Sequence, residues 1–228
     1  MSFYVEDTGT TFTPVPAGLH LARCYRVIDL GTQETNYEGK RDFKRQIKFV
    51  WEIHGNDDDG NPIVTGKGEP LIVTKDYNMT WNDKGTLRKD LQAWRGKAFT
   101  EDEQRRFDIK SILDKWCMLN IAHKPKKNGS GVYANVVGIT PVVAALKNSL
   151  PKGHNKCGIF MISEPDMDMF ETFGKYLKET IQKAPEWKAV QDRPKSEPAG
   201  VFDDMEDDRP FWSWMKQFLK RGKSGALA

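Results

Sequence analysis

The segment FKRQIKFVWEIHG, residues 43–55, decides the fold because apolar and polar side chains alternate along it. Side chains of a strand point to opposite faces with a period of two, so this alternation predicts a β-strand with one buried and one exposed face. The buried face takes Phe43, Ile47, Phe49, Trp51 and Ile53. The exposed face takes Lys44, Gln46, Lys48 and Glu52.

Four other segments also have strand character. Branched, aromatic and alternating residues predict strands at 18–31, 69–81, 116–124 and 131–140. The turn-forming run NDDDGNP separates the second strand from the third, and PKKNGSG reads as the hairpin loop between the last two.

Between the third and fourth strands the period becomes helical. Leu87, Leu91 and Trp94 recur at helical spacing and predict a helix over 83–96, with Asp83 or Thr86 as the N-cap and Gly96 as the stop. The run TEDE, residues 100–103, is a capping box that opens a second helical stretch reaching to about residue 115.

Three strands, a helix and two strands are the element order of the OB-fold, a five-stranded Greek-key barrel used for oligonucleotide binding. We therefore expect residues 1–150 to form a mainly β domain with helices, built on an OB-fold-like barrel. Residues 151–184 form a helical appendage that packs on the barrel or on a second copy in a homodimer. Its helix spans 163–184 with Ser163 as the N-cap. Residues 185–211 are expected to be a flexible linker with an acidic tip, and residues 212–228 a basic amphipathic extension.

Composition favours a soluble intracellular protein. The 228 residues include 38% hydrophobic and 29% charged residues, which is typical of a globular chain, and the net charge is +3. No apolar run has the roughly 20 residues of a membrane-spanning helix, and no signal peptide is visible. Three widely separated cysteines, Cys24, Cys117 and Cys157, favour the reducing cytoplasm over a disulfide framework.

Catalytic and metal-binding patterns are missing from the sequence. GNPIVTGKG, residues 60–68, lacks the glycine spacing and the Ser or Thr of a phosphate-binding loop. The four histidines are scattered, and His154 with Cys157 has no further ligands nearby. We therefore predict a binding protein without cofactor or metal and not an enzyme.

Two basic segments predict a nucleic-acid interface, since they fall in the two hairpin loops that flank the ligand groove of an OB-fold. The first hairpin and its second strand supply Lys40, Arg41, Lys44, Arg45 and Lys48. The last hairpin supplies Lys124, Lys126 and Lys127, and the third strand supplies Lys75. Aromatic residues near these cations are the predicted base-stacking platforms, namely Tyr37, Tyr77, Trp81 and Tyr133.

The run DDMEDDRPF, residues 203–211, resembles the acidic tip of bacterial and phage single-stranded-DNA-binding proteins. The strings VPAGLHLARCYRVIDLGTQ (15–33) and GTLRKDLQAWRGKAFT (85–100) resemble phage replication-module proteins. The resemblance implies an OB-fold, binding of single-stranded DNA in replication or recombination in the host cytoplasm, and docking of replication partners on the tip. The tip residues concerned are Asp203, Asp204, Glu206, Asp207, Asp208, Pro210 and Phe211.

The tip departs from the family pattern at two positions. Arg209 stands where an apolar residue is usual, and Phe211 is followed by residues 212–228, so the terminal carboxylate that partners grip is absent from it. Two alternatives stay open beside the DNA-binding hypothesis. One is a protein-interaction or regulatory module in which the acidic strip mimics DNA, and the other is a nucleic-acid-processing enzyme.

Overall fold

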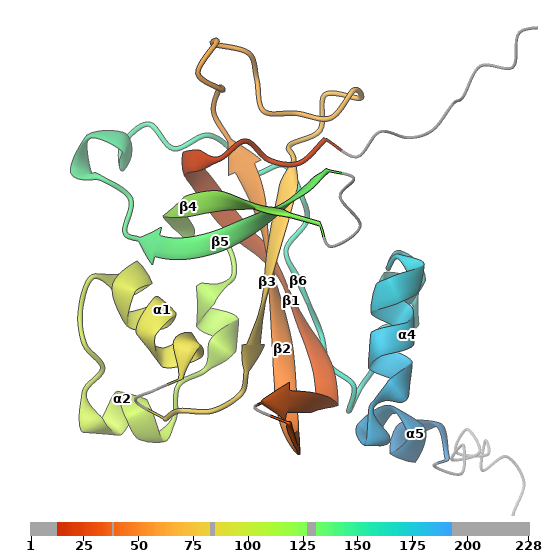
Figure 1. Cartoon of the computed structure of the whole chain (residues 1–228). Coiled ribbons are helices and arrows are strands. Elements are labelled where there is room, and N and C mark those ends of the chain that lie inside the picture. Colours follow the sequence, from red (N-terminus) through yellow and green to blue (C-terminus); the bar gives the residue numbers. More distant parts are fainter. Residues whose placement is uncertain (1–12, 38, 83–84, 127–130, 193–228) are drawn as a thin grey trace, which may run out of the picture. The chain divides into compact units, whose positions relative to one another are not determined.

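A computed structural model describes residues 13–37, 39–82, 85–126 and 131–192 (Figure 1). Within these residues six strands form one sheet in the order β3-β2-β1-β4-β5, and β6 pairs separately with β1. Every pair is antiparallel except β1 with β6, which is parallel. The strands are β1 Gly18–Tyr37, β2 Lys40–His54, β3 Ile72–Asn78, β4 Trp116–Pro125, β5 Val132–Thr140 and β6 Gly158–Phe160.

Strand β1 changes its partner along its length. One edge pairs with β2 from Leu21 to the hairpin end. On the other edge, Gly18–Arg23 pairs with β4 and Arg26–Ile28 pairs with β6. A register shift between Cys24 and Arg26 coincides with this change of partner. A bulge of this kind bends a strand and increases its twist, which lets β1 serve two neighbours in succession.

The predicted element order is confirmed, and the protein is mainly β with helices. The predicted closure is not seen: β3 and β5 approach within 8 Å between Cα atoms, but no hydrogen-bonded ladder joins them in the described part of the chain. Helix α1, Thr86–Arg95, packs against both of these strands.

The helices after β3 begin and end largely where the sequence indicates. Leu87, Leu91 and Trp94 are the buried face of α1, and Gly96 ends it in the left-handed conformation at φ 68°. Gly85 takes the N-cap position, so neither Asp83 nor Thr86 is the cap. Thr100 and Glu103 form the predicted capping box of α2, Glu101–Arg105, which is followed by a separate 3-10 helix, Ile109–Ile112.

After β6 the described residues, up to Asp192, form three short helices, so the single helix predicted over 163–184 is wrong. They are α3 Met167–Glu171, α4 Lys175–Lys183 and α5 Pro185–Gln191. Asp166, and not Ser163, caps α3 through its carboxylate. Extended backbone at Gly174 starts α4, and Pro185 takes the first turn of α5, where its missing N–H group is harmless. The predicted linker therefore begins within a helix.

Two apolar cores lie on opposite faces of β1 and β2. The larger core is enclosed by β1 to β5 and α1, and includes Phe49, Trp51 and Leu91. The smaller core lies under β6, α3, α4 and α5, which cover Tyr25, Ile28, Leu30 and Val50. Residues 151–184 thus pack on the sheet of the same chain, and the described residues up to Asp192 belong to one unit.

The alternation along β2 predicts most of its burial. Ile47, Phe49, Trp51 and Ile53 are buried as expected. Two residues differ: Phe43 is 67% exposed, because it lies beyond both cores near the hairpin end, and Glu52 is fully buried. No described helix is long and apolar enough to cross a membrane.

Candidate nucleic-acid interface

The end of the β1–β2 hairpin, residues 34–45 and here called the arm, carries four of the nine predicted cations, but carboxylates accompany them. Arg41 lies 3.3 Å from Glu34 and Lys44 lies 3.1 Å from Asp42. The hydrogen bond from Lys44 lowers the pKa of Asp42. These pairs are exposed, and exposed ion pairs contribute little to stability, so a polyanion can replace the carboxylates as partners.

Arg45 is held more firmly than its neighbours. Its guanidinium donates a 2.6 Å hydrogen bond to Asp29, a largely buried residue that also accepts from the backbone of Gly31. This contact raises the pKa of Arg45. Together with Lys44, Arg45 lines a groove of about 550 Å³, whose other wall is formed by Asn78, Met79, Thr80, Asn82, Gly85 and Thr86.

On β3 the structure corrects one predicted site residue, Tyr77, and places another, Lys75, in an ion pair. Tyr77 is 2% exposed, its ring packs on Phe49, and its hydroxyl donates to Asp90 at 2.8 Å. Burial, together with the Asp90 carboxylate, raises the pKa of Tyr77. Lys75 pairs with the same carboxylate at 2.7 Å. The side chains of Lys75 and Tyr77 lie on the same face of β3 as the buried Val73. The ring of Tyr77 therefore has no exposed face on which a base could stack.

Lys48 and Trp81 are also engaged in packing and pairing. Lys48 forms an ion pair with Asp76 on β3, and its side chain is only 17% exposed. Trp81 stacks on Phe107 with ring centroids 5.6 Å apart and meets Phe99 edge-on. One face of the indole is therefore covered, which argues against its predicted role as a base platform.

The end of the β4–β5 hairpin keeps two of its predicted cations, Lys124 and Lys126, and the aromatic Tyr133 at the surface. Lys124 is exposed, and the ammonium of Lys126 lies 5.3 Å from the ring centre of Tyr133. Tyr133 itself is 57% exposed. A cation beside an exposed ring combines a phosphate contact with a stacking surface.

Several predicted site residues lie outside the described residues. Lys127 and the side chain of Tyr37 are among them. So are the tip residues Asp203, Asp204, Glu206, Asp207, Asp208, Pro210 and Phe211.

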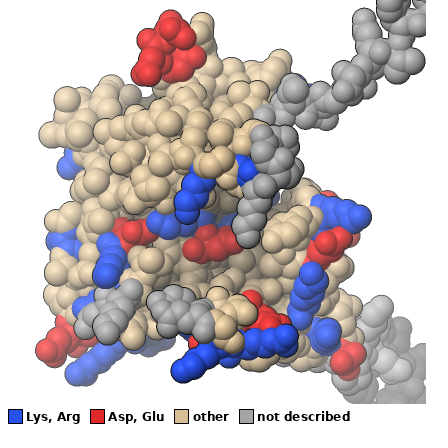
Figure 2. Space-filling model, in the orientation of Figure 1, with Lys and Arg blue, Asp and Glu red and all other residues tan. Residues whose placement is uncertain are grey.

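Positive and negative side chains are mixed on the face of the molecule shown in Figure 2. Figure 2 shows Lys and Arg side chains separated by Asp and Glu and not gathered into one continuous patch. Among the described residues, Lys40, Lys124 and Lys126 form no ion pair, unlike Arg41, Lys44 and Arg45, so they are the cations most available to an incoming phosphate at the two hairpin ends.

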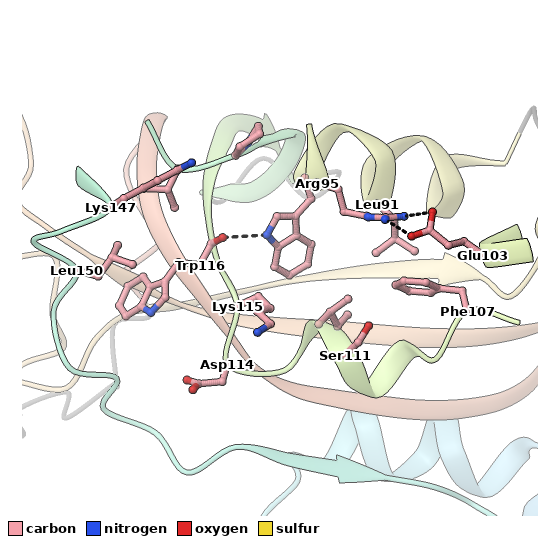
Figure 3. Close-up of a pocket in the computed structure, with 14 residues that line it drawn as sticks. Leu91, Arg95, Glu103, Phe107, Ser111, Asp114, Lys115, Trp116, Lys147 and Leu150 are labelled. Carbon is pink, nitrogen blue, oxygen red and sulfur yellow. Dashed lines mark hydrogen bonds and ion pairs between the residues drawn. The ribbon is translucent and has the colours of Figure 1, made fainter. Parts of the chain in front are cut away.

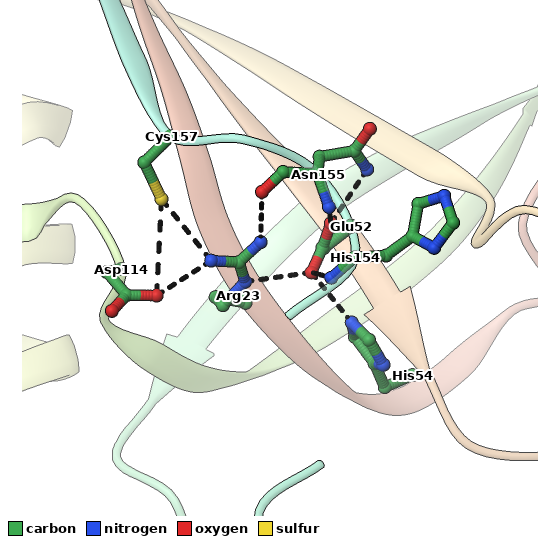
Figure 4. Close-up of polar contacts among 7 residues, drawn as sticks. All are labelled: Arg23, Glu52, His54, Asp114, His154, Asn155 and Cys157. Carbon is green, nitrogen blue, oxygen red and sulfur yellow. Dashed lines mark hydrogen bonds and ion pairs between the residues drawn. The ribbon is translucent and has the colours of Figure 1, made fainter. Parts of the chain in front are cut away.

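A buried polar network surrounds Glu52 (Figure 4), and no local sequence pattern indicates it. One carboxylate oxygen accepts from Arg23 at 2.8 Å and lies 2.9 Å from the Nε2 atom of His54. The carboxylate also accepts from the backbone N–H groups of His154 and Asn155, and from the side-chain amide of Asn155. We call this set, with Asp114 and Cys157, the Glu52 network.

The Glu52 network fixes the loop that leads into β6. Arg23 donates to Asp114 at 2.7 Å and to the carbonyl of Asn155 at 2.5 Å, and its Nη1 atom lies 3.3 Å from the sulfur of Cys157. Burial alone would raise the pKa of Glu52, but the hydrogen bonds from Arg23 and its neighbours lower it to about 2. A satisfied buried ion pair of this kind is structural, because none of its groups is free to bind another molecule.

A second candidate surface is a groove of about 740 Å³ beside α1 (Figure 3). Its walls are largely apolar and include Trp94, Phe107 and Leu150. Arg95 on its rim is paired with Glu103 at 2.5 Å, whereas Lys115 and Lys147 form no ion pair within the described residues.

No group of three or more His, Cys, Asp or Glu side chains that could hold a metal occurs within the described ranges. The three cysteines are free thiols, and burial raises the pKa of Cys24 and Cys117. No protein-family model matches the chain, and no characterised protein matches its sequence.

Proposed function

We propose that the chain binds single-stranded DNA through an open OB-type sheet, as a binding protein and not as an enzyme. The observation that carries the proposal is the strand order β3-β2-β1-β4-β5 with α1 between β3 and β4. The strand order supports the proposal because an OB-fold has the same order, although no ladder joins β3 to β5 within the described residues.

The two hairpin ends would hold the strand from both sides. Lys40 on the arm, and Lys124 and Lys126 on the β4–β5 hairpin, meet phosphates, and Tyr133 stacks on a base. Arg41 and Lys44 exchange their exposed carboxylate partners for phosphates. The resemblance of residues 203–211 to an acidic tip extends the proposal to recruitment of phage replication or recombination proteins.

The test is fluorescence anisotropy of the full chain with a labelled oligo-dT and with a duplex of equal length, over about 50 to 300 mM salt. Binding to the single strand should be tighter, and log K should fall linearly with log salt, by about 0.7 for each phosphate neutralised. Equal binding to both probes, or none at the lowest salt, contradicts the proposal.

A protein-interaction module is the second candidate, and the groove beside α1 favours it. An apolar lining with two lysines, Lys115 and Lys147, that form no ion pair within the described residues suits an acidic peptide with an aromatic side chain. A Lys115→Glu, Lys147→Glu variant should lose the binding of such a peptide while oligo-dT binding stays unchanged. Loss of oligo-dT binding instead would place the nucleic acid in this groove.

A further inference from the structure

Two exposed aromatic rings share one groove on the outer side of the sheet. Phe43 on β2 is 67% exposed and Tyr176 on α4 is 83% exposed. Among the described residues only Tyr133 is another aromatic side chain with comparable exposure. Phe43 and Tyr176 both line a groove of about 590 Å³ between the sheet and α4. Large exposed rings that gather at one place usually mark a binding surface.

The lining of this groove suits a flat molecule with polar edges. Leu30, Leu177 and Pro185 supply an apolar surface, while Gln46 and Thr180 supply polar atoms. The amide of Gln46 donates to Asn78, which leaves its carbonyl oxygen as an acceptor. A nucleobase has these properties, with two π faces and a hydrogen-bonding edge.

The charges of the groove do not prevent the approach of DNA. Its three carboxylates each have a cation nearby: Glu34 with Arg41, Asp76 with Lys48, and Glu179 with Lys175. Lys183, which also lines the groove, forms no ion pair within the described residues. Glu34, the cross-strand neighbour of Phe43, lies 3.3 Å from Arg41, so a base in the groove would be attached to a phosphate within reach of the Arg41 guanidinium.

We propose that Phe43 and Tyr176 are base-stacking residues, and that bases of a bound single strand enter the groove between β2 and α4. This inference rests on the proposed DNA binding and extends the interface onto α4, which lies outside the five strands and α1. Neither residue belongs to the set predicted from the sequence. Base stacking gives a role to the ring of Phe43, which lies beyond both cores and is 67% exposed.

The first test compares Phe43→Ala and Tyr176→Ala with the unaltered chain in oligo-dT binding. Loss of one stacked base weakens binding by about 5- to 150-fold. The slope of log K against log salt should not change, because a ring neutralises no phosphate. Tyr176→Phe keeps the ring and should bind normally, and Met167→Ala, an exposed apolar residue on α3 outside the groove, is the matched control.

The second test uses the unaltered chain, so that it does not depend on the folding of a variant. Oligonucleotides with 5-iododeoxyuridine are cross-linked by light and the attached peptides identified by mass spectrometry. Cross-links at Phe43 or Tyr176 support the inference. If the chain binds oligo-dT but neither residue is cross-linked and both alanine variants bind normally, the inference is wrong while the proposed function stands. If the chain does not bind oligo-dT, both fail.

A second copy of the chain is the competing occupant of the groove. Sedimentation of the unaltered chain and of the Phe43→Ala, Tyr176→Ala double variant separates the two. A dimer that dissociates in the double variant, with unchanged DNA affinity per protomer, would overturn the inference.

Discussion

Arg23 and Arg41 are each paired with a glutamate on the neighbouring strand of the same hairpin, but their surroundings are opposite. The side chains of Arg23 and Glu52 are 7% and 0% exposed, whereas those of Arg41 and Glu34 are 77% and 52% exposed. A buried charge must keep its partners, because the charge left behind cannot be solvated. An exposed charge loses little when its partner leaves. The β1–β2 hairpin is therefore held by a permanent ion pair at Arg23 and Glu52, whereas Arg41 at its exposed end is free to exchange Glu34 for another anion.

Glu52→Gln should have the largest effect on stability of the substitutions that test this comparison. It leaves Arg23 with less compensation in the interior, and we expect a loss of about 3 to 5 kcal/mol in the free energy of unfolding. Urea unfolding followed by circular dichroism measures the effect. Glu34→Gln on the arm is the matched control and should unfold at the same urea concentration as the unaltered chain. Equal effects of the two substitutions would contradict the comparison.

Low pH should remove the stabilisation that the Arg23–Glu52 ion pair contributes. The pKa of Glu52 lies near 2 in the folded protein, below its ordinary value of 4.5. The stabilisation is therefore complete above pH 4.5 and is lost as the pH falls towards 2, for a total of about 3 kcal/mol. The difference in unfolding free energy between the unaltered chain and Glu52→Gln should shrink over this range. A difference that does not change with pH would show that the ion pair is not its source.

A smaller effect is expected at Gly153, in the loop held by the Glu52 network. A Cβ atom at this position would overlap the guanidinium of Arg23, which Glu52 prevents from moving aside. Gly153→Ala should therefore destabilise the protein by about 1 to 3 kcal/mol. Gly66→Ala is the control, because nothing lies within 4 Å of its added Cβ. Equal thermal stability of the two variants would mean that the loop adjusts.

Substitutions at the exposed ends of the hairpins should have the smallest effect on stability and a measurable effect on DNA binding. Lys124→Ala should leave the melting temperature unchanged and reduce the salt slope of oligo-dT binding by about 0.7. Lys75→Ala should lower the melting temperature and leave the salt slope unchanged, since Lys75 is paired with Asp90 beside the core. An unchanged slope for Lys124→Ala would exclude this lysine from the interface.

Local patterns predicted the elements well and their long-range partners poorly. The alternation along β2 and the helical period of Leu87, Leu91 and Trp94 report on burial within one element, and both are confirmed. Glu52 looked exposed because its polarity fits the solvent face. Its burial depends on Arg23 and on a loop more than one hundred residues away, which no local pattern reveals.

The candidate site shows the same limit. Positive charges on the arm are visible in the sequence, but their pairing with Glu34, Asp42 and Asp29 is not. Tyr77 could have been assigned to the core, because it shares the parity of Val73 on β3. Tyr176 could not have been linked to Phe43, since only the packing of α4 on the sheet brings them to one groove.

Strand β1 contributes to both cores, and this has a consequence for how the protein opens. Ala22, Cys24 and Val27 enter the larger core, while Tyr25, Ile28 and Leu30 enter the smaller one. Neither core can separate without exposing part of the other through the shared strand. Amide protons of residues 22–30 of β1 should therefore exchange with solvent deuterium only when the whole unit unfolds. A fragment that ends at residue 150 would leave Tyr25, Ile28 and Leu30 uncovered and should be prone to aggregation.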